Sequence, residues 1–160
     1  MAPLTPAFFD TSILVAGLME IGEASKHPQS IMTAIAAGRI QRAVTAWHCC
    51  LEFYSVATRL PEEFRPPPED ALRLIEEEEV LARFEVRQLP DQAREPFLRT
   101  LEHERVVGGR VYDAHIAEIA RIARAKTVVT DNRRHFSSLA RDGIRVLSAE
   151  EFVRSSRLER

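Results

Sequence analysis

Two short apolar segments of this chain each run directly into an aspartate, and this pattern limits the folds that the chain can adopt. Ala7–Phe9 leads into Asp10, and the β-branched segment Thr127–Thr130 leads into Asp131. Both segments have the length and composition of buried strands. In a parallel sheet covered by helices, ligands bind outside the carboxyl ends of the strands. The two aspartates are therefore candidate site residues.

The pattern of strands alternating with helices continues along the whole chain. Strands are predicted at residues 7–10, 42–45, 84–89, 127–130 and 145–147. Helices are predicted over Gln29–Ala37, from Ala46 to about Arg59, from Pro68 onward, over Asp91–Glu104 and over Tyr112–Ala123. Two more are predicted, one after a cap at Thr11 or Ser12 and one after a capping box at Ser148 and Glu151. Thr45 is a predicted cap for the helix from Ala46, and Gly38 marks the end of Gln29–Ala37. This alternation predicts an α/β fold, a parallel-sheet α/β/α sandwich. We expect one domain over residues 1–153 and a frayed tail over residues 154–160.

Composition sets the class of protein. The 160 residues are 45% hydrophobic and 29% charged, as in one soluble globular domain. No apolar run approaches the roughly 20 residues that span a bilayer, and the N-terminus lacks the pattern of a signal peptide, so a cytoplasmic protein is expected. Cys49 and Cys50 are adjacent, which disfavours an ordinary disulfide, and no Cys/His pattern has zinc spacing.

Two further acids are predicted to reach the same edge of the sheet. Asp113 lies in the first turn of the helix that precedes the Thr127–Thr130 strand, so that helix begins at the edge where the strand ends. Glu52 lies about two turns into the helix after the second strand, and its longer side chain reaches the edge if that helix leans across it. Taken singly, each acid also fits an ordinary turn, cap or solvated helix position.

Four carboxylates at one point repel one another unless cations hold them. Mg2+ and Mn2+ prefer oxygen ligands and keep several waters, so Asp10, Glu52, Asp113 and Asp131 are candidate metal ligands and catalytic residues. Two such ions can activate water and stabilise the leaving oxygen in phosphodiester hydrolysis. Supporting contacts to waters or carboxylates are predicted for Thr11, Ser12, Thr130 and Asn132.

Positive charge is concentrated in the last third of the chain. Residues 105–160 hold 12 Lys and Arg against 7 Asp and Glu, although the net charge of the chain is −2. This distribution predicts contacts with phosphates, or alternatively a solvated surface whose charges point in several directions. The candidate RNA-binding residues are Arg110, Arg133, Arg134 and His135. His115 is two positions from Asp113 and is expected on a different side of its helix.

The motifs that carry these acids resemble those of PIN domains. Phe9-Asp10-Thr11-Ser12-Ile13-Leu14-Val15 is similar to the opening strand and turn of the family. Leu51-Glu52-Phe53, Tyr112-Asp113-Ala114-His115-Ile116-Ala117 and the segment from Val128 to Phe136 resemble the motifs of its second, third and fourth acids. The resemblance extends from about Ala7 to Phe152. In size and single-domain build the chain looks like the VapC-type toxins of toxin–antitoxin pairs.

This resemblance implies an endoribonuclease that depends on Mg2+ or Mn2+. It also implies a homodimer and a small antitoxin protein that blocks the site. An alternative is a non-catalytic PIN-like module that binds protein or RNA. A phosphoacceptor receiver domain fits less well, because Lys126 precedes its strand instead of following it. A dehalogenase-type phosphatase fits less well too, because Ser12 stands where a second aspartate is needed.

Overall fold

One parallel sheet forms the centre of the structure, as the alternating pattern predicted. The computed structural model describes residues 3–78 and 80–158, and within them the strand order is β3-β2-β1-β4-β5, with every neighbouring pair parallel. The strands are β1 (Ala7–Phe9), β2 (Ala43–Ala46), β3 (Glu85–Arg87), β4 (Thr127–Val129) and β5 (Arg145–Leu147). All five lie within or beside the predicted strand segments.

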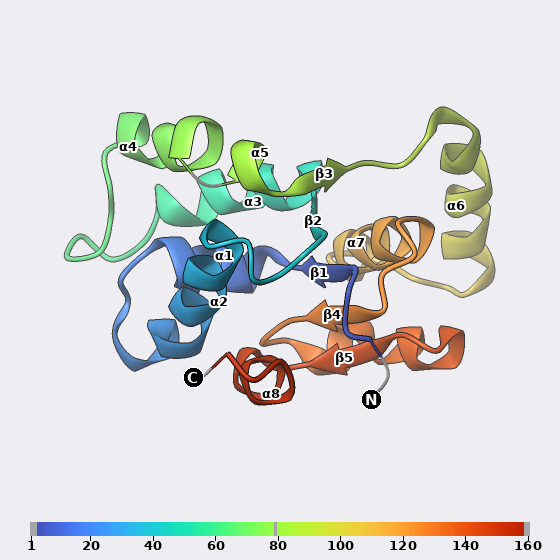
Figure 1. Cartoon of the computed structure of the whole chain (residues 1–160). Coiled ribbons are helices and arrows are strands. Elements are labelled where there is room, and N and C mark those ends of the chain that lie inside the picture. The colour runs from blue at the N-terminus through green and yellow to red at the C-terminus, as the bar shows by residue number, and fades with distance from the viewer. Residues whose placement is uncertain (1–2, 79, 159–160) are drawn as a thin grey trace.

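Helices cover both sides of this sheet. Figure 1 shows the strands through the middle of the molecule, from β3 at the top to β5 at the bottom, with α1 and α2 on one side and α6 and α7 on the other. The α-helices are α1 (Thr11–Leu18), α2 (Lys26–Ala36), α3 (Trp47–Ala57), α4 (Pro68–Arg73), α5 (Val80–Arg83), α6 (Asp91–His103), α7 (Arg110–Ile122) and α8 (Ala149–Ser155). Further helical turns are η1 (Gly22–Ser25), η2 (Leu74–Glu78) and η3 (Arg133–Asp142). The predicted α/β/α sandwich is confirmed.

The order of the strands creates a switch point beside β1. The chain builds outward from β1 to β2 and β3, then returns to place β4 on the other side of β1. Phe9 is opposite Val129 in the register of this pair, so β1 and β4 end together. Ligand sites in open α/β sheets lie at such a point, where adjacent connections leave in opposite directions.

The core is built on the central strand. Ala7, Phe8 and Phe9 are completely buried, because β1 has a strand on each side and helices above and below. The Phe9 ring packs edge-on against Phe84 and Phe152, with ring centroids 6.0 and 5.4 Å apart. Burial of this kind stabilises a large aromatic side chain by about 2 kcal/mol or more. The packing fixes the end of β1, and therefore the position of Asp10.

Three predicted helix starts are corrected by the structure. Asp10 caps α1 in place of Thr11 or Ser12, because its carboxylate accepts the Ser12 N–H. Thr45 caps nothing, since its hydroxyl donates instead to the Phe9 carbonyl at 2.8 Å. The second helix begins at Lys26, ahead of the predicted Gln29, and so includes Pro28, which is tolerated in a first turn.

The helix predicted from Pro68 is interrupted. Pro68 does open α4, but the helix continues as the π-helical segment η2 before α5 begins at Val80. Glu79, part of an acidic run expected on a solvated face or helix end, lies outside the described residues. At the other end of the chain the predicted capping box of Ser148 and Glu151 is confirmed, and α8 extends to Ser155. The predicted division between a domain and a tail at residue 153 stays a prediction.

None of the helices in the described ranges is long and apolar enough to cross a membrane. Cys49 and Cys50 are free and buried in α3, consistent with their use as small apolar residues.

Candidate active site

Asp10 is the most tightly held acid of the site. It is only 4% exposed, and its Oδ1 accepts hydrogen bonds from the Ser12 N–H (3.1 Å) and the Ser12 hydroxyl (2.6 Å). Its Oδ2 accepts a hydrogen bond from the Thr130 hydroxyl (2.6 Å). Burial raises the pKa of the Asp10 carboxyl to about 6, although these hydrogen bonds act in the opposite direction. Two of the predicted supporting residues therefore orient this carboxylate.

Asp131 is joined to Asp10 through the same serine. The Asp131 N–H donates to the Ser12 hydroxyl oxygen at 3.1 Å, so the Ser12 side chain bridges the ends of β1 and β4. The Asn132 N–H donates to the Thr130 hydroxyl oxygen at 3.0 Å, which means that Asn132 supports the site through its backbone. Partial desolvation raises the pKa of the Asp131 carboxyl.

Glu52 reaches the edge of the sheet from α3. Its Oε1 accepts a hydrogen bond from the Thr11 hydroxyl at 3.0 Å and lies 3.3 Å from Nε2 of His48. The His48 hydrogen bond is the largest influence on Glu52 and lowers the pKa of its carboxyl, while burial opposes this. Thr11, which directly follows Asp10, therefore holds Glu52 near the end of β1.

Asp113 lies in the first turn of α7, as predicted, and pairs with a histidine from η3. Its Oδ2 lies 3.1 Å from Nδ1 of His135. Burial raises the pKa of the Asp113 carboxyl, with the Glu52 charge adding to the effect and His135 opposing it. His135, which was predicted to contact RNA phosphates, thus contacts one of the candidate ligands.

The four acids influence one another as two pairs. The charge of Asp131 contributes to the raised pKa of Asp10, and the charge of Glu52 contributes to the raised pKa of Asp113. Repulsion of this kind disfavours the charged forms unless a cation compensates it. Within each pair the two carboxylates are close enough to repel one another, and the meeting of all four at one edge stays a prediction.

The donor chemistry of this edge fits a hard divalent cation, because all four candidate ligands are carboxylates. Among residues 3–78 and 80–158, however, no three His, Cys, Asp or Glu side chains converge closely enough to form a metal-binding group. Ligation by three or four of the acids therefore needs rotation of side chains. The partly exposed Glu52 and Asp113 have more freedom for this than Asp10. The ligand assignment stays a prediction.

The candidate RNA-binding arginines differ in their surroundings. Arg133 donates from Nη1 to both carboxylate oxygens of Glu151, at 2.8 and 2.9 Å, so part of its charge is already compensated. Arg134 lines a surface groove with Arg145 beside the edge strand β5. Arg110 lies three positions before Asp113 on α7, and its charge partly opposes the rise in the pKa of the Asp113 carboxyl.

The sequence model of the PIN domain matches residues 6–134, from β1 to the segment after β4. The chain belongs to the PIN-domain family. The match includes all four candidate acids of the site.

Similar proteins include ribonuclease VapC27 from Mycobacterium tuberculosis, which is 34% identical over 124 residues, 68% of this chain and 88% of the relative. Among solved structures, the Mycobacterium tuberculosis toxin VapC20, described as cleaving the sarcin–ricin loop, superposes with a TM-score of 0.60 at 16% identity, covering 82% of this chain and 93% of that one. FitAcB from Neisseria gonorrhoeae has a TM-score of 0.57 at 15% identity, covering 90% and 98% of the two chains. At these identities the solved structures support the fold alone.

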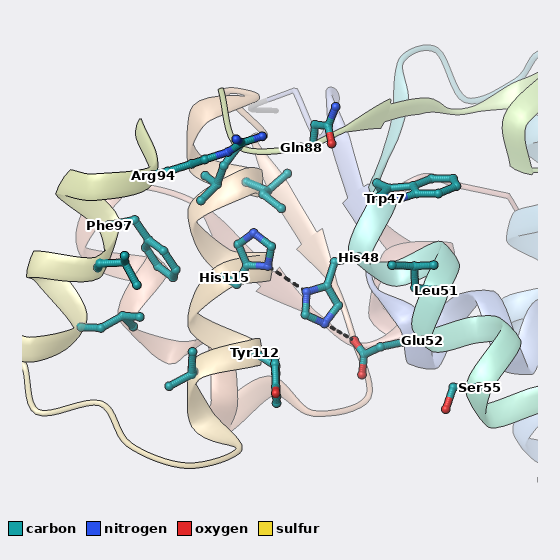
Figure 2. Close-up of a pocket in the computed structure, with 15 residues that line it drawn as sticks. Trp47, His48, Leu51, Glu52, Ser55, Gln88, Arg94, Phe97, Tyr112 and His115 are labelled. Carbon is teal, nitrogen blue, oxygen red and sulfur yellow. Dashed lines mark hydrogen bonds and ion pairs between the residues drawn. The ribbon is translucent and has the colours of Figure 1, made fainter. Parts of the chain in front are cut away.

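Two histidines of this PIN domain were missed as site residues. His48 lies one turn before Glu52 on α3, and its Nδ1 lies 2.8 Å from Nδ1 of His115 on α7 (Figure 2). His115 does lie away from the acids, as its position relative to Asp113 predicted. The spacing of four between His48 and Glu52 was a visible signal for their contact. The contact between His48 and His115 depends on how α3 packs against α7.

These histidines line an apolar groove of about 660 Å3 between α3, α6 and α7. Figure 2 shows Trp47, Leu51, Phe97 and Tyr112 around it, with Glu52 beside His48. Trp47 is 44% exposed and Tyr112 is 60% exposed. The groove therefore opens to solvent and shares one residue with the candidate active site of the PIN domain.

Proposed function

We propose that this protein is a divalent-metal-dependent endoribonuclease and the toxin of a toxin–antitoxin pair. The proposal is supported by the position of Asp10 and Asp131, which follow neighbouring strands at the switch point of a PIN-domain sheet and are bridged by Ser12. The charge of Glu52 raises the pKa of Asp113, as expected for two nearby acids. The similarity to ribonuclease VapC27, which extends over most of both chains, supports the choice of RNA as substrate.

In the proposed site Asp10, Glu52, Asp113 and Asp131 would hold Mg2+ or Mn2+, and a bound ion would supply activation of water and stabilisation of the leaving oxygen. The chain's own residues set up this site. Ser12 and Thr130 fix the Asp10 carboxylate, and Thr11 holds Glu52. We assign contacts with substrate phosphates to Arg110, Arg134 and His135, and to Arg133 when its pair with Glu151 opens.

The partners proposed for this toxin are an RNA substrate, a small antitoxin protein and a second copy of the chain. The antitoxin and the homodimer are both proposed from the family resemblance, and the similarity to ribonuclease VapC27 supports the RNA substrate. Such a pair acts in the cytoplasm, where its RNA is found.

Cleavage of RNA tests this proposal directly. Partner-free protein and its Asp113→Asn variant are incubated with deproteinised total cellular RNA, in Mn2+ and in EDTA. We expect discrete fragments only from the wild type with Mn2+, because the variant loses one of the carboxylates that hold the ion. Sequencing of the fragment ends identifies the substrate.

The thermal melt of the same proteins in EDTA is the matched control. Asp113→Asn removes a desolvated charge that Glu52 repels, so the metal-free variant is expected to melt at a higher temperature than the wild type. A variant that melts lower in EDTA, or cuts RNA at the wild-type rate, contradicts the proposed site. Intact RNA in every lane, with removal of partners verified, favours the non-catalytic binding module.

A further inference from the structure

Glu52 is the end of a hydrogen-bonded chain that extends away from the acids. His48 approaches Glu52 Oε1 with Nε2 at 3.3 Å and approaches Nδ1 of His115 with Nδ1 at 2.8 Å. The same Oε1 atom of Glu52 also accepts the Thr11 hydroxyl at 3.0 Å. Figure 2 shows the two rings in line with the carboxylate, one from α3 and one from α7. Three elements of the fold thus meet through one carboxylate and two imidazoles.

The facing ring nitrogens restrict where the protons of this chain lie. A 2.8 Å contact between two Nδ1 atoms is a hydrogen bond only if one carries a proton and the other accepts it. When His115 donates, His48 Nδ1 is the acceptor, and the neutral His48 ring must carry its proton on Nε2. Nε2 is the atom that faces Glu52. With His115 as the donor, His48 is in the form that donates to the Glu52 carboxylate.

Packing holds both rings in this arrangement. The His48 side chain is 16% exposed, and its ring packs edge-on against Tyr112 at 5.7 Å between centroids. His115 packs against Phe97 at the same distance. Ring nitrogens among apolar side chains need partners, because an unmet hydrogen bond there costs about 1–3 kcal/mol. Each ring therefore depends on the other, and His48 depends on Glu52.

We propose that His48 and His115 are positioning residues for the candidate metal ligand Glu52. His48 holds the carboxylate through Nε2, and His115 fixes the ring orientation and the tautomer of His48. This inference rests on the proposed function, because it assigns Glu52 to the metal. Neighbours that orient a metal ligand typically change metal affinity about 10- to 100-fold when they are replaced.

Binding of Mn2+, measured by electron paramagnetic resonance of the free ion, tests the inference without reference to catalysis. His48→Phe keeps a ring in the groove and removes both nitrogens, so we expect it to weaken Mn2+ binding by at least about 10-fold. His115→Phe keeps the packing against Phe97 and removes the partner of His48, so it is expected to weaken binding as well. Circular dichroism and thermal melts establish that each variant is folded.

Two further variants separate positioning from general packing. His115→Asn places an amide near the position of Nδ1, and it is expected to retain Mn2+ affinity close to wild type. Phe97→Leu keeps an apolar side chain against the His115 ring and leaves every hydrogen-bonding group in place, so it is expected to bind Mn2+ as the wild type does. In a double-mutant cycle, His115→Phe is expected to add little in the His48→Phe background, because its effect passes through His48.

The results distinguish this inference from the proposed function. Normal Mn2+ affinity in His48→Phe, additive effects in the cycle, or equal losses in Phe97→Leu overturn the positioning role. If the wild type nevertheless cuts RNA with Mn2+, the proposed function stands without it. A wild-type protein that neither binds Mn2+ nor cuts RNA overturns both. Weak binding in both phenylalanine variants with rescue in His115→Asn supports the inference.

Discussion

Asp10 combines a structural role with a place in the candidate site. Its carboxylate caps α1 and is held by Ser12 and Thr130, yet burial leaves the charged form poorly solvated. The same residue therefore orders the local backbone and, without a cation, lowers the stability of the fold at neutral pH. This combination gives a pH dependence that is specific to the metal-free protein.

We predict that Asp10→Asn stabilises the metal-free protein at pH 7.5 but not at pH 4. The pKa of about 6 in the folded state exceeds the usual aspartate pKa of 3.8, so between these pH values the folded chain binds more protons than the unfolded chain. Stability thus falls as pH rises from 3.8 to 6, by at most about 3 kcal/mol. Hydrogen bonds lost with the carboxylate reduce the gain to a few degrees in melting temperature.

Melting curves in EDTA between pH 4 and pH 8 measure this difference. A gain that does not change with pH would mean that the charge of Asp10 is solvated in the folded chain. Addition of Mn2+ at pH 7.5 is expected to reverse the order of the two melting temperatures, because only the wild type has the full set of carboxylates.

For single residues, the sequence predicts where a side chain lies in the fold better than which side chain it contacts. Asp10 and Asp131 follow apolar strands, and the parallel sheet puts them side by side, so their proximity is predictable. The pairing of Asp113 with His135 and of His48 with His115 is not, because each joins elements whose mutual orientation depends on the packed core. Arg133 was predicted to face RNA, but its pair with Glu151 depends on where α8 docks.

Two helices, α2 and α7, are followed by a residue in the same left-handed backbone conformation, but the residue types differ. Gly38 after α2 and Arg124 after α7 both have a positive φ, 71° and 58°. In each case the next N–H bonds back to a carbonyl one turn earlier, from Arg39 to Ala34 and from Ala125 to Ala120. This closing turn favours glycine, because a side chain in the left-handed region is strained. From the sequence, therefore, only Gly38 was predicted to end a helix.

This difference predicts opposite effects of two substitutions. Gly38→Ala places a Cβ in open space, so its effect is the backbone strain alone, and we expect a loss of about 1 kcal/mol in the free energy of unfolding. Arg124→Gly relieves the same strain and is expected to gain about 0.5–1 kcal/mol. Urea unfolding of both variants measures this. Destabilisation by Arg124→Gly would show that contacts of the arginine side chain outweigh the strain.

The element pattern was predictable where one local signal dominates. Asp91–His103 and Ala149–Ser155 form helices close to their predicted bounds, the second with its capping box. Errors arose where a tertiary contact competes, as at Thr45, whose hydroxyl bonds to β1. Another arose after Pro68, where the chain changes to a π-helical segment that no local pattern marks.

Across the whole molecule, positive charge is concentrated in the last third of the chain, and this affects the proposed binding of RNA. The basic excess of residues 105–160 includes Arg134 and Arg145 in one groove beside β5, while Arg133 is paired with Glu151. Contacts to phosphates make binding weaken as salt rises, in proportion to their number. We therefore expect Arg134 to contribute more to phosphate binding than Arg133, whose charge is already paired with Glu151.

We predict that Arg134→Glu weakens RNA binding and reduces the slope of log K against log salt by about 1. Reversal at both Arg133 and Arg134 is expected to reduce the slope further. The Asp113→Asn background prevents cleavage during the titrations, and Glu151→Gln is the matched control, because it frees Arg133 without adding negative charge. An unchanged slope in Arg134→Glu and in the double reversal would place these arginines away from the RNA.

In the proposed site, four carboxylates from the ends of β1 and β4 and from α3 and α7 close around a cation. Anomalous diffraction from crystals of the protein soaked in Mn2+ tests it most directly. We predict a manganese peak ligated by Asp10, with at least two of Glu52, Asp113 and Asp131 rotated toward it. Crystals in which manganese binds elsewhere, or in which the four carboxylates keep their metal-free positions at saturating Mn2+, would contradict the account.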